Sequence, residues 1–537
     1  MRASLIAALL AFLLTVPWLG KEFYSRGEPR EALVAQSMLT TGNWLVGTGY
    51  GGVVPSKPPF THWLMALSSY VCGGMNEYAS RLPAALALVL FAFYYARFLS
   101  RRYGEEFAIL ASLILLLSAE WLRAGVSARV DTVLSVTLAA AFLSFYEASE
   151  NQFKRYPILL PLLLCMATLT KGPVALLLAM GVFGLYLLLT KHKFLEIARK
   201  LSLLIAPAAL LSGIWYLAGF TEAGDKFGAK FYYENIARFA GTMEDEPHRH
   251  SVFYLYGTVF LGLLPWTLLF LPILFRKLRE WGWARFSLKS FDTFQMFALC
   301  ATLVLIVFYS IPSSKRSVYL LPIYPFLSFW VARAVMQIDQ RESRWVSWGT
   351  LLVCIVTTGL LVTLVLNGTG ALSIPGLPSN LTVFSPIFFL TAGALAGLTL
   401  YLFAKFWISK QLLVLRDLVA VCYLLALMLN ASVLPAFSQA RSPKSFVAQI
   451  KSETEKADRI YSFGYEFYGV SFYLNRRIDT LKDSLRVGDL VLLYDKDLQG
   501  FNSKFGERFD IKVVERSSYE IEKPDGFVNL ISIQDKK

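Results

Sequence analysis

The sequence predicts a polytopic α-helical membrane protein with about 13 transmembrane helices and a small C-terminal α/β domain outside the membrane. Of its 537 residues, 55% are hydrophobic and only 17% are charged, whereas a soluble protein carries about a quarter charged residues. Apolar stretches of roughly 20 residues recur along the chain, and each is long enough to cross a ~30 Å bilayer core as a helix. Strict two-residue alternation is absent from these stretches, which argues against a membrane β-barrel.

The charges between thirteen candidate spans indicate their orientation. If the N-terminus is cytoplasmic, the connections after even-numbered spans are cytoplasmic, and these connections hold an excess of Lys and Arg residues, as in 191–200 and 276–289. This distribution fits the positive-inside rule. Residues 1–20 resemble a signal peptide but lack a convincing cleavage site, so we expect them to remain as the first span. The expected spans are 3–20, 79–99, 105–121, 131–149, 156–170, 172–190, 201–221, 252–275, 293–312, 317–336, 346–366, 384–404 and 413–436.

Thirteen spans place the C-terminal tail on the outer side, so we expect an inner (plasma) membrane protein of a Gram-negative cell with a periplasmic C-terminal domain. The net charge of +14 is explained by orientation signals, and no signature of a nucleic-acid-binding module is present. Nucleic acid is therefore not an expected partner. The five cysteines are scattered singly, so we expect small buried residues and not a metal site or a disulfide framework.

Two domains are expected. Residues 1–438 form the transmembrane domain, which includes an outer-face loop and interfacial helices at 21–78; the stretch 60–74 is apolar but short, and it suits a helix lying in the membrane interface. Residues 439–537 form the periplasmic α/β domain. Its expected elements are a charged helix at 443–456 and the β-like runs "RIYSFG", "VSFYL", "LVLLY", "IKVVE" and "FVNLISI".

Among the basic residues on the predicted outer side, five form a cluster that the positive-inside rule does not explain, because that rule leaves few cations beside a span on this side. A single lysine at a membrane boundary commonly extends its amine to the interface, so each residue alone has an ordinary structural explanation. Together they indicate a binding site for an anionic lipid head group, such as a phosphate. These residues are Lys57, Arg81, Lys171, Lys315 and Arg316.

Acidic residues on the same side are candidate catalytic groups. Glu28, in the segment "SRGEPREAL", either takes part in a reaction or favours a helix N-terminus. Asp131 either caps a helix or is a buried carboxylate that pairs with the outer cations. The loop "EDEPHRH" holds Glu246, His248 and His250, a candidate site for a divalent cation, although loop clusters of this kind are usually solvated.

A series of motifs resembles bacterial polyprenyl-phosphate-sugar glycosyltransferases of the GT-C fold, which are similar to protein O-mannosyltransferases and to the aminoarabinose–lipid A transferase. The chain departs from the family pattern twice: Gly27 stands where the first acid of an Asp-Glu-x-Arg motif is usual, and Ser56 where a glutamate often precedes Lys-Pro-Pro. The matching motifs run in order from about residue 24 to 330 and are "GEPREALVAQSMLTTGNWLV", "SKPPFTHWLMAL", "EYASRLPAALA", "ARVDTVLSVTLAAAFL", "ATLTKGPVALLL", "FLGLLPWTLLFLP" and "SSKRSVYLLPIYPFLSF".

The resemblance implies an inverting glycosyltransferase that moves a sugar from a polyprenyl (undecaprenyl) phosphate carrier to a lipid A, glycan or protein acceptor on the periplasmic face, without a required cofactor. Cations in a low-dielectric cleft stabilise the departing phosphate, and Lys57 is the first candidate for this role. If the acceptor is a hydroxyl, Glu28 is the leading candidate for the general base, with Asp131 next and Arg30 as an orienting residue. A phosphate acceptor is already ionised and needs no strong base.

Three alternatives stay open at this point. A flippase or transporter of lipid-linked sugars also needs outer cations and many spans, although such proteins tend to contain internal repeats and the two halves of this chain show none. An enzyme that passes whole oligosaccharides to protein calls for a larger outer domain. A catalytically inactive relative is the third alternative, because Gly27 replaces an acid of the family pattern.

Overall fold

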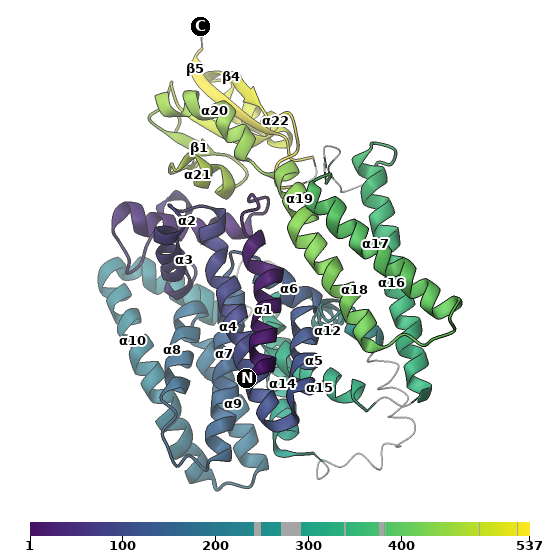
Figure 1. Cartoon of the computed structure of the whole chain (residues 1–537). Coiled ribbons are helices and arrows are strands. Elements are labelled where there is room, and N and C mark those ends of the chain that lie inside the picture. Colours follow the sequence, from purple (N-terminus) through teal and green to yellow (C-terminus); the bar gives the residue numbers. More distant parts are fainter. Residues whose placement is uncertain are drawn as a thin grey trace.

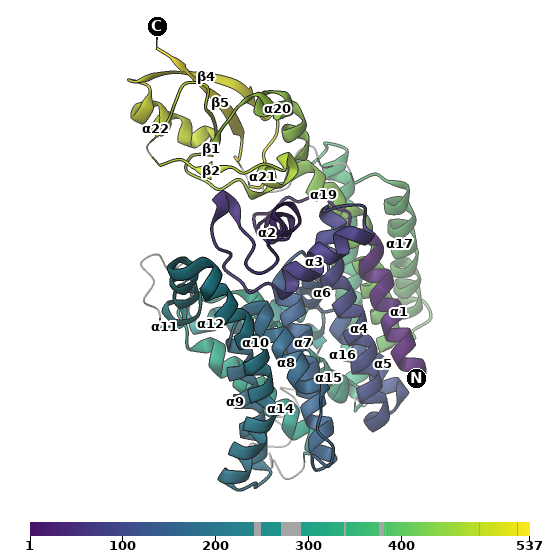
Figure 2. The same cartoon turned by 90° about the vertical axis from the view of Figure 1, so that its left-hand side faces the viewer.

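The computed structural model describes residues 1–240, 249–269, 291–337, 340–374, 378, 381, 383–482, 484–523 and 525–536. Most of the chain forms a bundle of helices, and the C-terminal residues form an α/β layer at one end of it (Figure 1). Helices α2 (Gly27–Thr41) and α3 (Phe60–Val71) lie between these two parts (Figure 2). The predicted fold class is therefore confirmed.

Where the chain is described, each predicted span overlaps one or more helices of the bundle, and residues 270–275 of the span expected at 252–275 lie outside the described residues. Within the described ranges, eight helices are long and apolar enough to cross a membrane, and a ninth span results if the bent pair α5–α6 counts as one. Shorter apolar helices occupy the other predicted positions, so the total of thirteen stays a prediction. The bundle elements are α1 (Arg2–Thr15), η1 (Val16–Trp18), α4 (Glu77–Tyr103), α5 (Glu105–Leu116), α6 (Ala119–Gly125), α7 (Val130–Glu150), α8 (Leu159–Lys171), α9 (Val174–Leu189), α10 (Phe194–Tyr232), α12 (Val252–Gly262), α14 (Thr293–Ser310), η6 (Ser317–Ile323), α15 (Tyr324–Val335), α16 (Gln340–Gly368), α17 (Pro386–Trp407), α18 (Leu415–Met428), η7 (Leu429–Val433) and α19 (Leu434–Arg441).

The span expected at 105–121 is broken into α5 and α6, which meet at an angle of 74°. The hydroxyl of Ser118 donates a hydrogen bond to the carbonyl of Ile114 at 2.7 Å. The next amide, that of Ala119, donates to the carbonyl of Leu264 at 3.2 Å. Because this amide bonds to another segment, it cannot continue the hydrogen-bond ladder of α5, and the helix ends here.

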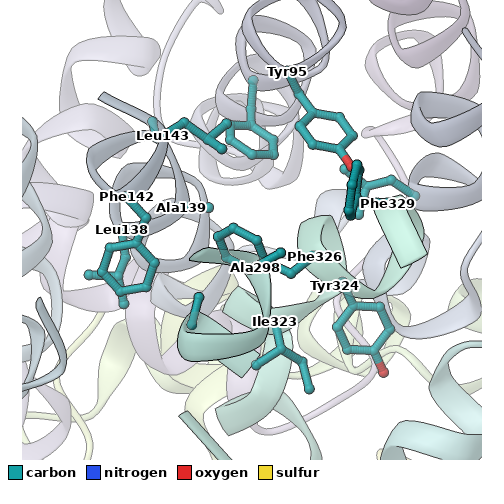
Figure 3. Close-up of a cluster of buried hydrophobic side chains, with 14 of the residues drawn as sticks. Tyr95, Leu138, Ala139, Phe142, Leu143, Ala298, Ile323, Tyr324, Phe326 and Phe329 are labelled. Carbon is teal, nitrogen blue, oxygen red and sulfur yellow. The ribbon is translucent and has the colours of Figure 1, made fainter. Parts of the chain in front are cut away.

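Helix α7 is the centre of the bundle. Every residue from Val130 to Tyr146 is buried, as expected for a helix that is surrounded on all sides. Its apolar side chains, such as that of Phe142, meet those of α4, α14 and α15 (Figure 3). Phe145 stacks on Phe183 of α9 with ring centroids 3.9 Å apart. This packed core fixes the first turn of α7, which carries Asp131.

Helices α2 and α3 form the layer beneath the C-terminal domain. Helix α2 has Pro29 in its first turn, where a missing amide hydrogen removes no intrahelical bond. It ends at Gly42, whose φ of +73° suits glycine. Helix α3 begins after Pro59 and packs against α2 and α4. It is the short helix expected at 60–74; its place in the membrane interface stays a prediction.

The C-terminal domain is built on a five-stranded sheet with the order β2-β1-β3-β5-β4. Strand β1 (Ile460–Ser462) pairs in parallel with β2 (Asp479–Thr480) and with β3 (Leu490–Tyr494). Strand β5 (Val528–Asp535) pairs antiparallel with β3 and with β4 (Phe509–Arg516). The central strand β3 is buried at every position, as its continuous apolar run requires. The helices of this domain are α20 (Lys444–Lys456), α21 (Tyr468–Leu474) and α22 (Asp495–Phe505).

One predicted strand of this domain is wrong. The run "VSFYL" lies in helix α21, whose residues Tyr468–Phe472 are all buried. A short apolar run is compatible with either a strand or a buried helix, so its pattern does not decide between them. Helix α21 uses this apolar surface to pack against α2. The other four runs are strands β1, β3, β4 and β5, and the expected helix at 443–456 is α20.

Polar contacts join the C-terminal domain to the segment before α2. The hydroxyl of Tyr473 accepts a hydrogen bond from the amide of Phe23 and donates one to Glu77, both at 2.9 Å. Arg26 forms an ion pair with Glu466. These contacts hold the chain that enters α2, so the domain helps to position the residues of that helix.

Glu522 makes the stability of this junction dependent on pH. Burial raises the pKa of Glu522 to about 7, although its carboxylate accepts a hydrogen bond from Tyr465 at 3.0 Å. A carboxyl group with a raised folded-state pKa costs stability as the pH rises from its unfolded value toward that pKa. We expect the unfolding temperature of the wild type, relative to that of Glu522→Gln, to fall between pH 4.5 and pH 7. A difference in unfolding temperature between the two proteins that does not change with pH would contradict this role of Glu522.

Candidate active site

Glu28 and Arg81 form a buried ion pair behind the first turn of α2. The Nε and Nη2 atoms of Arg81 donate to the two carboxylate oxygens of Glu28 at 2.7 and 3.0 Å. The amide of Ala128 also donates to Oε1 of Glu28, at 2.9 Å. Arg81 Nη1 donates to the carbonyl groups of Leu19, at 2.7 Å, and Lys21. The pair thus ties α4 to α2 and to the chain that precedes it.

This pairing limits the chemistry of Glu28. Burial alone raises the pKa of Glu28, but the charge and hydrogen bonds of Arg81 prevail and lower it to about 2. A carboxylate with this pKa accepts a proton poorly near neutral pH. The geometry therefore favours a structural role for Glu28 and Arg81 over the predicted roles as general base and phosphate ligand.

Arg30 is held by the buried Glu31, which the buried His62 contacts in turn. Its Nη2 and Nε atoms donate to Oε1 of Glu31 at 2.6 and 3.1 Å, and Oε2 of Glu31 lies 3.0 Å from Nε2 of His62 on α3. Burial raises the pKa of Glu31, but Arg30 and His62 outweigh it and hold that pKa well below its usual range. Glu31 and His62 thereby fix the guanidinium group of Arg30, which interacts electrostatically with Asp131.

Asp131 connects two cations at the first turn of α7. Its Oδ1 atom accepts a hydrogen bond from Nζ of Lys171 at 2.7 Å, and its Oδ2 atom lies 3.4 Å from Nε of Arg129. Nζ of Lys171 also lies 4.6 Å from the ring centroid of Tyr319. Because a carboxylate between two cations is stabilised in its charged form, Asp131 is suited to orient Lys171 and Arg129.

The guanidinium group of Arg129 fills the space beside Gly27. A Cβ atom at position 27 would lie 2.9 Å from Nη1 of Arg129, which is closer than ordinary van der Waals contact. An acid at this position, as in the family pattern, would require Arg129 to move. In this chain the guanidinium group of Arg129 therefore lies beside a glycine at the position where the family pattern has a carboxylate.

Lys57 contacts an acid that was not among the predicted site residues. Its Nζ atom lies 2.8 Å from Oε2 of Glu234, and Nη1 of Arg238 lies 2.9 Å from the same oxygen. Burial is the main influence on the pKa of Lys57 and lowers it, although Glu234 opposes the shift. Glu234 lies in η3 (Tyr233–Ala237), a π-helical turn between α10 and α11 (Arg238–Ala240); such turns are frequent at functional sites.

A pocket of about 200 Å³ lies between Lys57, Lys171 and Arg238. These three residues supply its positive charges and Glu234 supplies a negative one, while Leu177 of α9 and Phe308 of α14 supply part of an apolar wall. Cations bind phosphate oxygens through charge-assisted hydrogen bonds, and the apolar wall suits a hydrocarbon chain. The pocket is thus suited to a phosphate group attached to a lipid.

The two basic residues that precede η6 differ in their surroundings. The buried amine of Lys315 donates a hydrogen bond to the carbonyl of Pro312, so the backbone engages it. Arg316 interacts electrostatically with Tyr319, Arg129 and Arg30, and burial lowers its pKa. The structure therefore places Arg316 near Arg30 and Arg129, whereas Lys315 binds a backbone carbonyl.

The predicted divalent-cation site falls mainly outside the described residues, which do not include Glu246 and His248. His250 donates a hydrogen bond from its amide to the carbonyl of Ser313 at 3.2 Å, and its ring stacks on Tyr254 with centroids 4.0 Å apart. In the part of the chain that is described, no group of three or more His, Cys, Asp or Glu side chains is arranged to hold a metal ion. Metal binding stays a prediction.

Gly172 supports the geometry behind Lys171. Its φ of +111° is one that side chains rarely tolerate, and a Cβ atom there would lie 2.5 Å from Oδ1 of Asn235 in η3. We expect Gly172→Ala to strain the turn that follows Lys171 and to displace the side chain of Asn235, and thereby to lower kcat/KM about 10- to 100-fold, with a stability loss of about 1–3 kcal/mol. Initial rates and thermal unfolding measure both effects.

The matched control is Gly213→Ala in α10, where an added Cβ atom meets nothing within 4 Å. It should leave the rate near that of the wild type. Equal rates for Gly172→Ala and Gly213→Ala would contradict a positioning role for this turn.

The side chains that pair with the predicted site residues were not predicted, because spacing in the sequence does not reveal such pairs. His62 lies in an apolar segment and Glu31 appeared as one more charge of α2. Glu234 and Arg238 do carry a usable signal, since an acid and a base four residues apart form ion pairs on a helix. They lie beyond the expected span at 201–221, because α10 continues to Tyr232 with a kink at Gly224.

Known proteins match this chain along most of its length. The family model for dolichyl-phosphate-mannose-protein mannosyltransferase matches residues 56–216. An undecaprenyl phosphate-alpha-4-amino-4-deoxy-L-arabinose arabinosyl transferase from Pectobacterium atrosepticum is 26% identical over 465 residues, which cover 83% of this chain and 78% of that enzyme. The enzyme of the same name from Aeromonas hydrophila is 28% identical over 365 residues, covering 65% of this chain and 64% of that enzyme.

The fold also matches that of a solved structure. The crystal structure of ArnT from Cupriavidus metallidurans bound to undecaprenyl phosphate has a TM-score of 0.72 to this chain, with 18% sequence identity, and the match covers 99% of this chain and 97% of that one. At this identity the likeness shows the fold alone. Sequence and fold together confirm the predicted resemblance to GT-C polyprenyl-phosphate-sugar transferases, and with it the predicted enzyme class, a glycosyltransferase.

Proposed function

We propose that this protein is an inverting glycosyltransferase that moves a sugar from undecaprenyl phosphate to a phosphate group of a lipid acceptor, such as lipid A, on the periplasmic face. The pocket that joins Lys57, Lys171 and Arg238 to an apolar wall carries the proposal. The names of the relatives support the donor, because they are arabinosyl transferases that use an undecaprenyl phosphate-linked sugar.

The donor chemistry needs cations at the leaving group. When the bond between the anomeric carbon and the phosphate oxygen breaks, negative charge develops on the departing phosphate. Lys57 and Lys171 line the pocket, and fixed cations in a site of low dielectric constant stabilise such developing charge strongly. The apolar side chains of Leu177 and Phe308 would contact the first prenyl units of the carrier.

Three arginines beside the pocket favour an anionic acceptor. Arg30, Arg129 and Arg316 interact electrostatically with one another or with Asp131, which itself binds Lys171 in the pocket. The low pKa values of Glu28 and Glu31 make both of them poor bases. A phosphate acceptor is already ionised near neutral pH, so it attacks without a general base; attack opposite to the leaving phosphate inverts the anomeric carbon.

The test is sugar transfer by the purified protein. It is incubated with an undecaprenyl phosphate-linked amino sugar and with lipid A, and mass spectrometry follows both lipids. We expect one undecaprenyl phosphate released for each lipid A that gains a sugar, and no transfer to lipid A from which the phosphates have been removed.

Three results would overturn the proposal. Release of the sugar to water alone would indicate a hydrolase, and transfer to dephosphorylated lipid A at an equal rate would exclude a phosphate acceptor. Movement of the donor across liposomes without cleavage would favour the flippase alternative.

A further inference from the structure

We propose that the end of the helix bundle remote from the C-terminal domain contains a second phosphate-binding site, which holds the head group of an anionic phospholipid. A pocket of about 570 Å³ lies there, between the end of α7, the turn after α9 and the first turns of α10. These helix ends lie opposite to the C-terminal domain (Figure 1). The proposal does not depend on the sugar-transfer reaction.

The polar lining of this pocket matches a phosphate group. Arg199 and Lys200 line it, and within the described ranges neither of them forms an ion pair. Thr190 and His192 add two further polar groups to the lining, and Nδ1 of His192 lies 3.2 Å from the hydroxyl of Thr190. A guanidinium fork and an ammonium group are the donors that bind phosphate oxygens most strongly. Among the described lining residues, Glu196 is the only acid.

The backbone around the pocket adopts an uncommon conformation. Gln152, Phe153 and Lys191 have φ values of +52°, +55° and +62°, a region that residues other than glycine seldom enter. Gln152 and Phe153 line the pocket, and Nζ of Lys200 lies 5.0 Å from the ring centroid of Phe153. Such conformations cost of order 1–3 kcal/mol each and cluster at ligand-binding sites.

The surroundings favour a lipid over a dissolved anion. Phe194 and Leu195, at the start of α10, are 85% and 79% exposed, and large apolar side chains at a helix end suit the boundary between head groups and acyl chains. Basic side chains near that boundary attract anionic lipids. The pocket would therefore bind the phosphate of a lipid whose acyl chains lie against these two residues.

The test compares lipid binding by matched variants of the full-length protein. Native mass spectrometry measures retention of phosphatidylglycerol, with phosphatidylcholine as the zwitterionic reference. Arg199→Gln/Lys200→Gln removes two charges from the pocket, while Lys154→Gln/Arg155→Gln removes two exposed charges from outside its lining. We expect the pocket variant to bind phosphatidylglycerol about tenfold more weakly or worse, and the control to stay within about twofold of the wild type.

Several outcomes overturn the proposal. Equal losses in both variants would mean that only the total charge matters, and equal retention of the two lipids would exclude a head-group site. Complete displacement of phosphatidylglycerol by millimolar inorganic phosphate would identify a dissolved anion as the occupant. The single variants Arg199→Gln and Lys200→Gln, each checked by thermal unfolding, keep the comparison valid if the double variant does not fold.

Discussion

Glu28→Leu should lower the free energy of unfolding by about 3–5 kcal/mol, because it leaves the buried guanidinium group of Arg81 without its counter-charge. Arg81 is fully buried, so water cannot replace the lost carboxylate. Glu28→Gln should destabilise less, since its amide still offers one hydrogen-bond acceptor. Unfolding in detergent, followed by tryptophan fluorescence or scanning calorimetry, measures the difference.

The pH dependence adds an independent check on this pair. Because Arg81 lowers the pKa of Glu28 to about 2, the stabilising contribution of Glu28 is complete above its unfolded value of 4.5 and is lost as the pH falls toward 2. The difference in the free energy of unfolding between the wild type and Glu28→Leu should therefore decrease only below pH 4.5. Glu106→Leu, at an exposed position in the first turn of α5, is the control. A folded, fully stable Glu28→Leu protein without transferase activity would instead return Glu28 to the role of catalytic base.

Lys171→Gln should lower kcat/KM for sugar transfer by about 10²–10³-fold, because it removes one of the cations that we propose to stabilise the leaving phosphate. The fold should persist, since Asp131 keeps Arg129 as a partner. Lys171→Arg should restore part of the rate, because it retains the charge with a different shape. Initial rates with the undecaprenyl phosphate-linked sugar measure these effects.

The control for Lys171 is Lys226→Gln, which removes an exposed lysine of α10. Its rate should match that of the wild type within about twofold, as most surface substitutions cost little. Wild-type kinetics in a folded Lys171→Gln protein would remove Lys171 from the site.

Hydrophobicity was sufficient to predict the polytopic helical fold class, whereas the orientation that the charges indicate and the total of thirteen spans stay predictions. Spans are set by the thickness of the bilayer and loops by the positive-inside rule, so both are visible in a single sequence. They also led to Lys57 and Lys171, since a cation beside a span on the outer side departs from that rule. The structure brings these two lysines to one pocket, although they are more than a hundred positions apart.

Side-chain pairing was not predictable in the same way. Glu28 and Arg81 both appeared to be site residues because both are charged and lie near a membrane boundary. Only the packing of α4 against the chain before α2 reveals that they neutralise each other. Glu234 was hidden for a related reason: it reaches Lys57 because α10 continues past its expected end.

The departure at Gly27 also gains a physical explanation. The sequence shows only that an acid of the family pattern is missing, which left an inactive relative as an alternative. In the structure, Arg129 lies against Gly27 and within 3.4 Å of Asp131. Without an acid at position 27 the surroundings of Arg129 are more positive, which favours an acceptor that brings its own negative charge, and this links the departure to the proposed phosphate acceptor.

The most direct test of the central claim is the affinity of the purified protein for undecaprenyl phosphate. It should be measured by native mass spectrometry for the wild type, for Lys57→Gln and for Lys226→Gln. The account predicts that Lys57→Gln binds about tenfold more weakly, as expected for the loss of one charge-assisted contact, and that Lys226→Gln binds like the wild type. Equal affinity in all three folded proteins would contradict the assignment of this pocket to the lipid phosphate.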